Sequence, residues 1–232
     1  MKKIVFIIMT VLLIVIIYVL NLDRKVFFFV IGDSIALGKS DNNVVTNYND
    51  YIKNSLEKDK RLERYVNEYT TTDLRINDVI NDINNNKKIS TNNKTYNIKN
   101  LLIKADLVTI SINNEDVLSK LNNNYTVKEL YTWADELAKD YETMLMTIRS
   151  YCKEKIFVIG YYYPNITENS SNKISIISYL NDTFKEISSL YKVEYINTAE
   201  LFIENNSFLD KYYPTELGQE QISKQVLLKF NN

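Results

Sequence analysis

Residues 26–31 form an uninterrupted apolar segment, VFFFVI, that leads directly into Gly32, Asp33 and Ser34. Such a run of β-branched and aromatic residues is typical of a strand that is buried on both faces. A strand of this kind belongs inside a parallel sheet that is covered by helices on both sides. The segment therefore favours an α/β fold and places Asp33 and Ser34 where a buried strand ends.

Further along the chain, short apolar segments alternate with stretches of helical periodicity. Strands are predicted at residues 26–31, 107–111, 155–160 and 193–196, and helices at residues 48–56, 76–83, 127–152, 173–191 and from 215 onwards. This alternation predicts βαβ units with right-handed crossovers, and ligands bind such sheets at the carboxyl ends of the strands. The segments expected at that edge are Ser34, the residues after Ser111, and residues 161–164 and 210–214.

The N-terminal segment has a different character. Residues 4–20 contain no charged side chain over 17 positions, a length at the short end of the range for membrane-spanning helices. A cleaved signal peptide is the alternative interpretation, but the segment has no alanine or glycine to form a cleavage site. We therefore expect residues 1–25 to be an uncleaved membrane anchor with a short linker, and residues 26–232 to be one domain.

The charges that flank this segment predict its orientation. Lys2 and Lys3 precede it, whereas Asp23, Arg24 and Lys25 nearly cancel behind it. The positive-inside rule then predicts a single-pass protein of the cell membrane with an extracytoplasmic domain. The first 25 residues carry +3 of a total charge of −1, which leaves −4 on the domain. The domain therefore lacks the excess of basic residues that would indicate a nucleic-acid partner.

Three sequence blocks, taken in order, resemble those of the SGNH/GDSL-type hydrolases. Residues 32–38 read Gly-Asp-Ser-x-x-x-Gly, residues 105–111 fit a second buried strand of the family, and residues 210–214 read Asp-x-x-Tyr-Pro before an amphipathic helix. The resemblance covers nearly all of residues 26–232, and it is to small membrane-anchored or secreted members from low-GC Gram-positive bacteria and their wall-less relatives. It implies a three-layer α/β/α sandwich with a central parallel sheet, here preceded by one N-terminal transmembrane helix.

The chemistry of that family uses a serine nucleophile and a histidine base placed three residues after an aspartate. The resemblance makes Ser34 the nominal nucleophile and puts Asp210 at the position of the triad acid. Tyr213 stands in place of the histidine, and the chain contains no histidine at all. Because a tyrosine has a pKa near 10, it is a poor base at neutral pH.

The positions of the oxyanion hole also depart from the family pattern. Asp73 falls where a glycine is expected and Glu115 where an asparagine is expected, although a one-residue shift would make Asn114 the donor. Carboxylates repel the developing negative charge, and the loss of a single donor costs about 10²–10³ in rate. We therefore predict a non-catalytic, esterase-like protein that binds or scaffolds an envelope glycan, a lipid or a protein partner.

Other interpretations stay open. An active serine esterase acting on acylated glycans or lipids would need a base other than histidine, such as Lys211 or a buried carboxylate. Ser34 is otherwise expected to cap a helix. Several carboxylates could converge on a cation, but we expect them to face solvent or cap helices, so no metal or cofactor is predicted. The acidic residues concerned are Asp33, Asp73, Glu115, Asp116 and Asp210.

Overall fold

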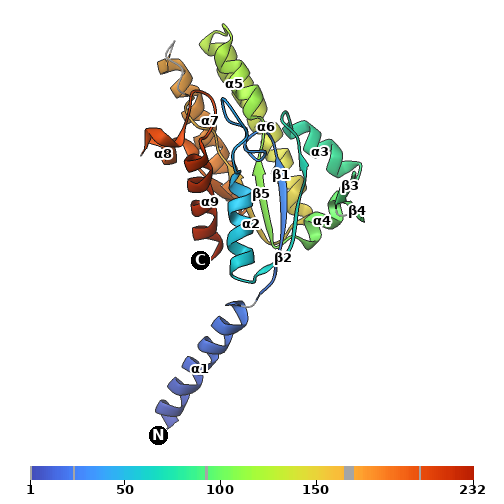
Figure 1. The fold of residues 1–232 in the computed structure, drawn as a ribbon, viewed down its shortest axis with the longest axis vertical. Coiled ribbons are helices and arrows are strands. Elements are labelled where there is room, and N and C mark those ends of the chain that lie inside the picture. The colour runs from blue at the N-terminus through green and yellow to red at the C-terminus, as the bar shows by residue number, and fades with distance from the viewer. Residues whose placement is uncertain (1, 23, 92–93, 165–169, 204) are drawn as a thin grey trace.

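The structure is a computed structural model that describes residues 2–22, 24–91, 94–164, 170–203 and 205–232 (Figure 1). Its strands are β1 (Val26–Gly32), β2 (Leu62–Thr70), β3 (Lys88–Thr91), β4 (Lys94–Asn97), β5 (Leu107–Ser111), β6 (Lys155–Ile159) and β7 (Glu194–Ile196). Its helices are α1 (Lys2–Leu22), α2 (Tyr48–Lys58), α3 (Ile76–Asn84), α4 (Ile98–Lys104), α5 (Asn114–Asn122), α6 (Val127–Tyr151), α7 (Ser170–Leu190), α8 (Thr198–Ile203), the 3₁₀ turn η1 (Asn206–Phe208) and α9 (Glu216–Phe230).

Five strands form one parallel sheet in the order β2-β1-β5-β6-β7. All seven residues of β1 are buried, as the apolar run predicted. Gly32, the last residue of β1, lies opposite Thr70 of β2 and Ser111 of β5. The carboxyl ends of these three strands therefore meet at one edge, and the loop that carries Ser34 begins there.

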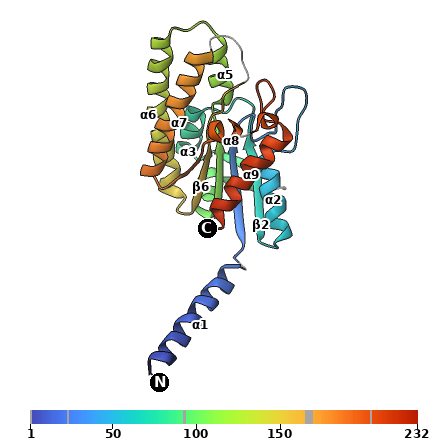
Figure 2. The ribbon, with the colours of Figure 1, turned by 90° about the vertical axis from the view of Figure 1, so that its left-hand side faces the viewer.

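Helices cover both faces of the sheet (Figure 2). Phe27, Phe29 and Ile31 of β1 pack into a core with α3, α4, α6 and α7. Phe28 and Val30 pack into a second core with α2, α8 and α9 on the other face. Successive side chains of a strand point to opposite sides, so β1 contributes to both cores. The predicted three-layer α/β/α sandwich with a central parallel sheet is confirmed.

The N-terminal segment forms α1, which leaves the sheet at the edge where the strands begin (Figures 1 and 2). The described apolar side chains of residues 6–15 are exposed. Within the described parts of the chain, no helix has the combined length and apolar character needed to cross a bilayer. Asp23 of the predicted linker lies outside the described residues.

Candidate functional site

The Gly-Asp-Ser motif leads into a tight turn at the carboxyl end of β1, and no helix begins at Ser34. The turn is closed by backbone hydrogen bonds from Leu37 to Asp33 (3.1 Å) and from Lys39 to Ser34 (2.9 Å). Gly38 ends it with a φ of +70°, and a Cβ at this position would lie 2.1 Å from the carbonyl oxygen of Val45. Glycine is therefore required where the chain turns away from the sheet.

Ser34 is buried in this turn, at the carboxyl end of β1. Its side chain is 0% exposed, and its Oγ has no hydrogen-bond partner among the described residues. A nucleophilic serine needs both a base within hydrogen-bond reach and access for the acyl carbonyl. The predicted helix cap is wrong, because residues 33–38 form a turn and no helix begins at Ser34. Within the turn, Oδ1 of Asp33 accepts a hydrogen bond from the Ile35 N–H, at 3.1 Å.

Asp33 is a fully buried carboxylate that joins β1 to the start of α5. Its Oδ2 accepts from the backbone N–H of Asn114 at 2.9 Å and from the Asn114 side-chain amide at 2.7 Å. Burial raises the pKa of Asp33, and the hydrogen bonds from Asn114 and Ile35 oppose that shift. Asn114, the alternative oxyanion donor, thus directs its side-chain amide at the Asp33 carboxylate.

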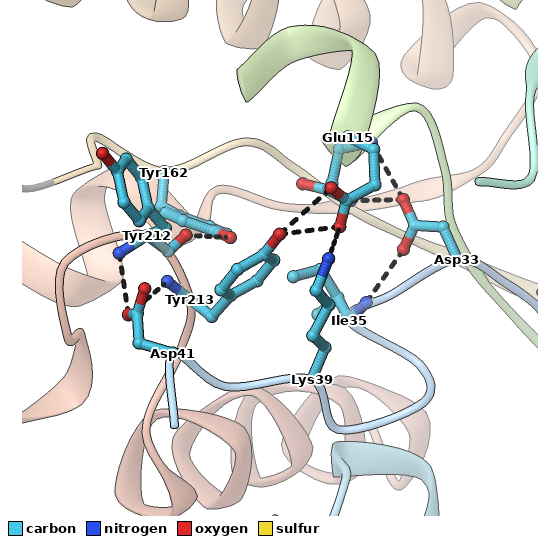
Figure 3. A network of polar contacts seen from close by, with 9 residues as sticks. Asp33, Ile35, Lys39, Asp41, Glu115, Tyr162, Tyr212 and Tyr213 are labelled. Carbon is cyan, nitrogen blue, oxygen red and sulfur yellow. Dashed lines mark hydrogen bonds and ion pairs between the residues drawn. The ribbon is translucent and has the colours of Figure 1, made fainter. Parts of the chain in front are cut away.

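Lys39, Glu115 and Tyr213 form a polar cluster at the carboxyl edge of the sheet (Figure 3). The Tyr213 hydroxyl donates to the Glu115 carboxylate, at 2.9 Å from Oε1 and 3.0 Å from Oε2. Lys39 Nζ lies 2.9 Å from Oε1 of Glu115 and 4.6 Å from the centroid of the Tyr213 ring, which is within cation–π range. The Lys39–Glu115–Tyr213 cluster therefore gives the carboxylate both a cation and a phenol donor.

The electrostatics of this cluster fix two of its protonation states. Burial raises the pKa of Tyr213, the Lys39 ammonium opposes the shift, and the Glu115 carboxylate adds to it. Burial lowers the pKa of Lys39, but contacts with Tyr213 and Glu115 outweigh this effect and the pKa is raised. Both groups are protonated at neutral pH, so neither is available as a proton acceptor.

Asp210 does not form a side-chain pair with Tyr213. Its side chain is exposed, and only its backbone N–H contacts Tyr213, by donating to the carbonyl oxygen at 3.0 Å. Asp41 holds this loop instead, because its Oδ2 accepts from the backbone N–H groups of Tyr212 (2.9 Å) and Tyr213 (3.3 Å). A third hydrogen bond to this loop comes from the Tyr162 hydroxyl, which donates to the Tyr212 carbonyl oxygen at 2.9 Å (Figure 3).

The sequence did not single out Lys39, Asp41 or, as an individual residue, Tyr162. Lys39 and Asp41 lie in the polar segment that follows Gly38, where no motif marks them. Tyr162 belongs to the Tyr161-Tyr162-Tyr163-Pro164 segment, which was expected at this edge because it follows a strand. Only the position of that segment after β6 could have indicated its part in the site.

The acidic residues considered as a cation site do not gather at one point. Asp73 is exposed in the turn between β2 and α3, as Asp210 is in its own loop. Asp116 pairs with Arg75 at 2.9 Å, whereas Asp33 and Glu115 have the partners described above. Across the described residues, no three His, Cys, Asp or Glu side chains are placed to hold a metal ion.

The chain matches no protein-family model and no curated protein in sequence, but its fold is similar to those of solved esterases. The lipase Lip_vut3 from a goat rumen metagenome has a TM-score of 0.72 and 19% identity, over 87% of this chain and 95% of that one. The acetylxylan esterase Axe2 from Geobacillus stearothermophilus has a TM-score of 0.66 and 16% identity, over 91% of this chain and 96% of that one.

Three further structures are catalytic mutants of Axe2, each with one residue replaced by alanine. The residues replaced are a serine, an aspartate, and a histidine three positions after that aspartate. The structural similarity covers nearly the whole length of both proteins. It also agrees with the order of the three blocks in this sequence. The chain therefore has the fold of the SGNH/GDSL-type hydrolases, as its sequence blocks predicted.

Proposed function

We propose that this chain is a non-catalytic protein of the SGNH/GDSL-hydrolase fold that binds or scaffolds a partner at the cell envelope. The observation that carries the proposal is the state of Ser34, whose Oγ is buried and has no hydrogen-bond partner among the described residues. The Tyr213 hydroxyl, in the place of the histidine, donates to Glu115. A phenol that already donates its proton does not take one from a serine.

The comparison with Axe2 supports this proposal. The aspartate and the histidine replaced in its catalytic mutants are three positions apart, the spacing of Asp210 and Tyr213 here. In a catalytic triad the carboxylate orients the base by a direct side-chain hydrogen bond. Here the Asp210 carboxylate is exposed and the Tyr213 hydroxyl is bonded to Glu115, so the spacing is retained without the interaction.

The proposed location is the cell membrane, with a single N-terminal anchor and an extracytoplasmic domain. Its support is the uncharged segment of residues 4–20 and the two lysines that precede it. The proposed partners are an envelope glycan, an acylated lipid or a protein. They would bind at the carboxyl edge of the sheet, because parallel sheets bind ligands there.

A serine-reactive probe tests the loss of catalysis. The full chain in detergent micelles is treated with a fluorophosphonate probe and assayed on short-chain acyl esters, with Axe2 as the active reference and Ser34→Ala as the control. We expect neither labelling nor turnover above the level of Ser34→Ala. Labelling and turnover that are both lost in Ser34→Ala would overturn the proposal. That result would support the alternative, an active acylhydrolase on acylated glycans or lipids with a base other than histidine.

A further inference from the structure

The charges of the domain are distributed unevenly between the two edges of the sheet. Five segments lead from a helix into a strand of the parallel sheet, and we call the surface of their described residues the amino-edge face. It comprises residues 24–25, 58–62, 104–107, 151–155 and 190–194. These residues include nine Lys or Arg and four Asp or Glu. The five segments that lead from a strand of this sheet into the following helix contain two Lys or Arg and four Asp or Glu. The whole domain carries a net charge of −4.

Most described acidic groups of the amino-edge face already have a cationic partner. Arg24 pairs with Asp106 at 2.8 Å and with Glu154 at 3.2 Å, and Glu194 pairs with Lys229 at 3.2 Å. Seven exposed lysines of the face form no ion pair with any described residue. They are Lys25, Lys58, Lys60, Lys104, Lys153, Lys155 and Lys192.

A recess of about 730 Å³ opens on the same face, between the segments that precede β6 and β7. Arg149 of α6 fastens both segments, because its guanidinium donates to the carbonyl oxygens of Glu154 (2.7 Å), Tyr191 (2.9 Å) and Lys192 (2.7 Å). The Arg149 guanidinium is thus occupied by backbone carbonyls. Five lysines also line the recess, of which Lys229 pairs with Glu194 and Lys153 donates to the carbonyl oxygens of Arg149 and Ser150. They are Lys153, Lys155, Lys185, Lys192 and Lys229.

The position of this face indicates its partner. Helix α1 leaves the domain at the same edge, and the linker between α1 and β1 is three residues long, which spans at most about 11 Å (Figure 1). The distance from these lysines to a membrane that holds α1 would therefore be comparable to the Debye length, which is about 8 Å. Ammonium groups form charge-assisted hydrogen bonds to phosphate oxygens, and basic segments beside a bilayer are attracted to anionic lipids.

We propose that the amino-edge face binds the phosphate groups of anionic phospholipids in the membrane that anchors the chain, with one headgroup in the recess. The proposal rests on the anchor put forward above, but not on the state of Ser34. Binding in this way holds the sheet upright on the bilayer and keeps its carboxyl edge away from the lipid. The membrane then contributes to the orientation of the domain as well as to its location.

Lysine reactivity tests this directly. The full chain is reconstituted in nanodiscs of phosphatidylcholine alone or with phosphatidylglycerol added, and each lysine's acetylation rate is measured by mass spectrometry. We expect Lys153, Lys155 and Lys192 to react about five-fold more slowly in the anionic discs, because one basic residue near such a surface gains about 1 kcal/mol. High salt should abolish this protection. Lys128 and Lys211 are exposed elsewhere on the domain and should react equally in both discs.

Matched variants and a soluble phosphate separate the outcomes. The triple variant Lys153→Gln, Lys155→Gln and Lys192→Gln should reduce the protection of Lys60 and Lys104, whereas Lys128→Gln, Lys139→Gln and Lys211→Gln should not. Equal acetylation in both discs overturns the proposal. Equal protection by glycerol phosphate with neutral discs overturns the lipid assignment in favour of a soluble phosphate ligand. A chain that does not enter discs refutes the anchor, and protection by added vesicles of the same compositions then decides the proposal.

Discussion

Tyr213 and Glu115 are 98 residues apart in the chain, yet the hydroxyl of one lies within 3.0 Å of both carboxylate oxygens of the other. The contact joins the loop before α9 to the first turn of α5. It leaves the tyrosine as a hydrogen-bond donor with a fixed orientation. Tyr213 therefore links the loop before α9 to helix α5.

A double-mutant cycle measures this contact. Tyr213→Phe removes the donor and Glu115→Gln removes the charged acceptor, and we expect a coupling free energy of about 1–2 kcal/mol, because hydrogen bonds to charged groups exceed neutral ones. Urea unfolding of the full chain in detergent micelles, followed by the fluorescence of Trp133, gives the four stabilities. Tyr212→Phe is the control, since the Tyr212 hydroxyl has no hydrogen bond to a described residue. A coupling within error of zero would contradict the structure.

A histidine at position 213 should not confer ester hydrolysis. In Tyr213→His the new imidazole would face Glu115 and Lys39, while the Asp210 carboxylate stays exposed and the Ser34 hydroxyl stays buried. We expect hydrolysis of short-chain acyl esters to stay at the level of Ser34→Ala, with Trp133 emission as the check on folding. A rate that rises about ten-fold or more and depends on Ser34 would show that one residue had blocked an otherwise complete site.

Asp41 and Asp210 should differ sharply in their effect on the loop of residues 209–214. Asp41→Ala leaves two backbone N–H groups without their acceptor, so we expect a loss of about 1–3 kcal/mol in unfolding free energy and faster hydrogen exchange in the loop. Asp41→Asn keeps an acceptor oxygen and should lose less. Asp210→Ala removes only an exposed side chain and should change stability by less than about 0.5 kcal/mol. A larger loss of stability in Asp210→Ala than in Asp41→Ala would show that Asp210, and not Asp41, holds the loop of residues 209–214.

Asp33 should make stability depend on pH in a known direction. Burial raises its pKa in the folded chain above the ordinary value of 3.8, so between the two values the folded state holds a proton that the unfolded state has lost. The contribution of this group to stability then falls as the pH rises through that interval. Relative to Asp33→Asn, the unchanged chain should therefore lose stability from about pH 4 upward. Urea titrations at several pH values measure this, with Asp210→Asn as the control for net charge. A constant difference would argue against the shift.

The sequence predicted the buried central strands and helices better than it predicted the edge strand β2 and the β3–β4 hairpin. Strands β1, β5, β6 and β7 and helix α6 each contribute several buried side chains to the cores, and all were expected close to their observed bounds. Strand β2 was missed because it lies at the edge of the sheet, where only Val66 and Tyr69 are buried among charged neighbours. The β3–β4 hairpin has four residues in each strand, too few to show a period.

The site was predictable only where a motif marked it. The positions of Ser34, Asn114, Glu115 and Tyr213 could be read from block order, and the structure brings Glu115 and Tyr213 into contact. The roles of Lys39 and Asp41 depend on how a loop packs against segments more than 70 residues away, which no local pattern records. The same reason explains Asp210, because its exposure follows from the path of its loop and not from its spacing to Tyr213.

The departure of α1 from the edge where the strands begin has a consequence for the kind of partner that can reach the site. A strand rises about 3.3 Å per residue, so the five residues of β5 hold the Lys39–Glu115–Tyr213 cluster about 15 Å beyond the amino-edge face. On an anchored chain this cluster lies on the side of the sheet away from the membrane. An acyl chain in the same bilayer would have to leave the hydrocarbon to arrive there, whereas a polar polymer or a folded protein outside the membrane meets it first. On the proposed anchored chain, the direction of approach would therefore select ligands before any side chain selects them by shape.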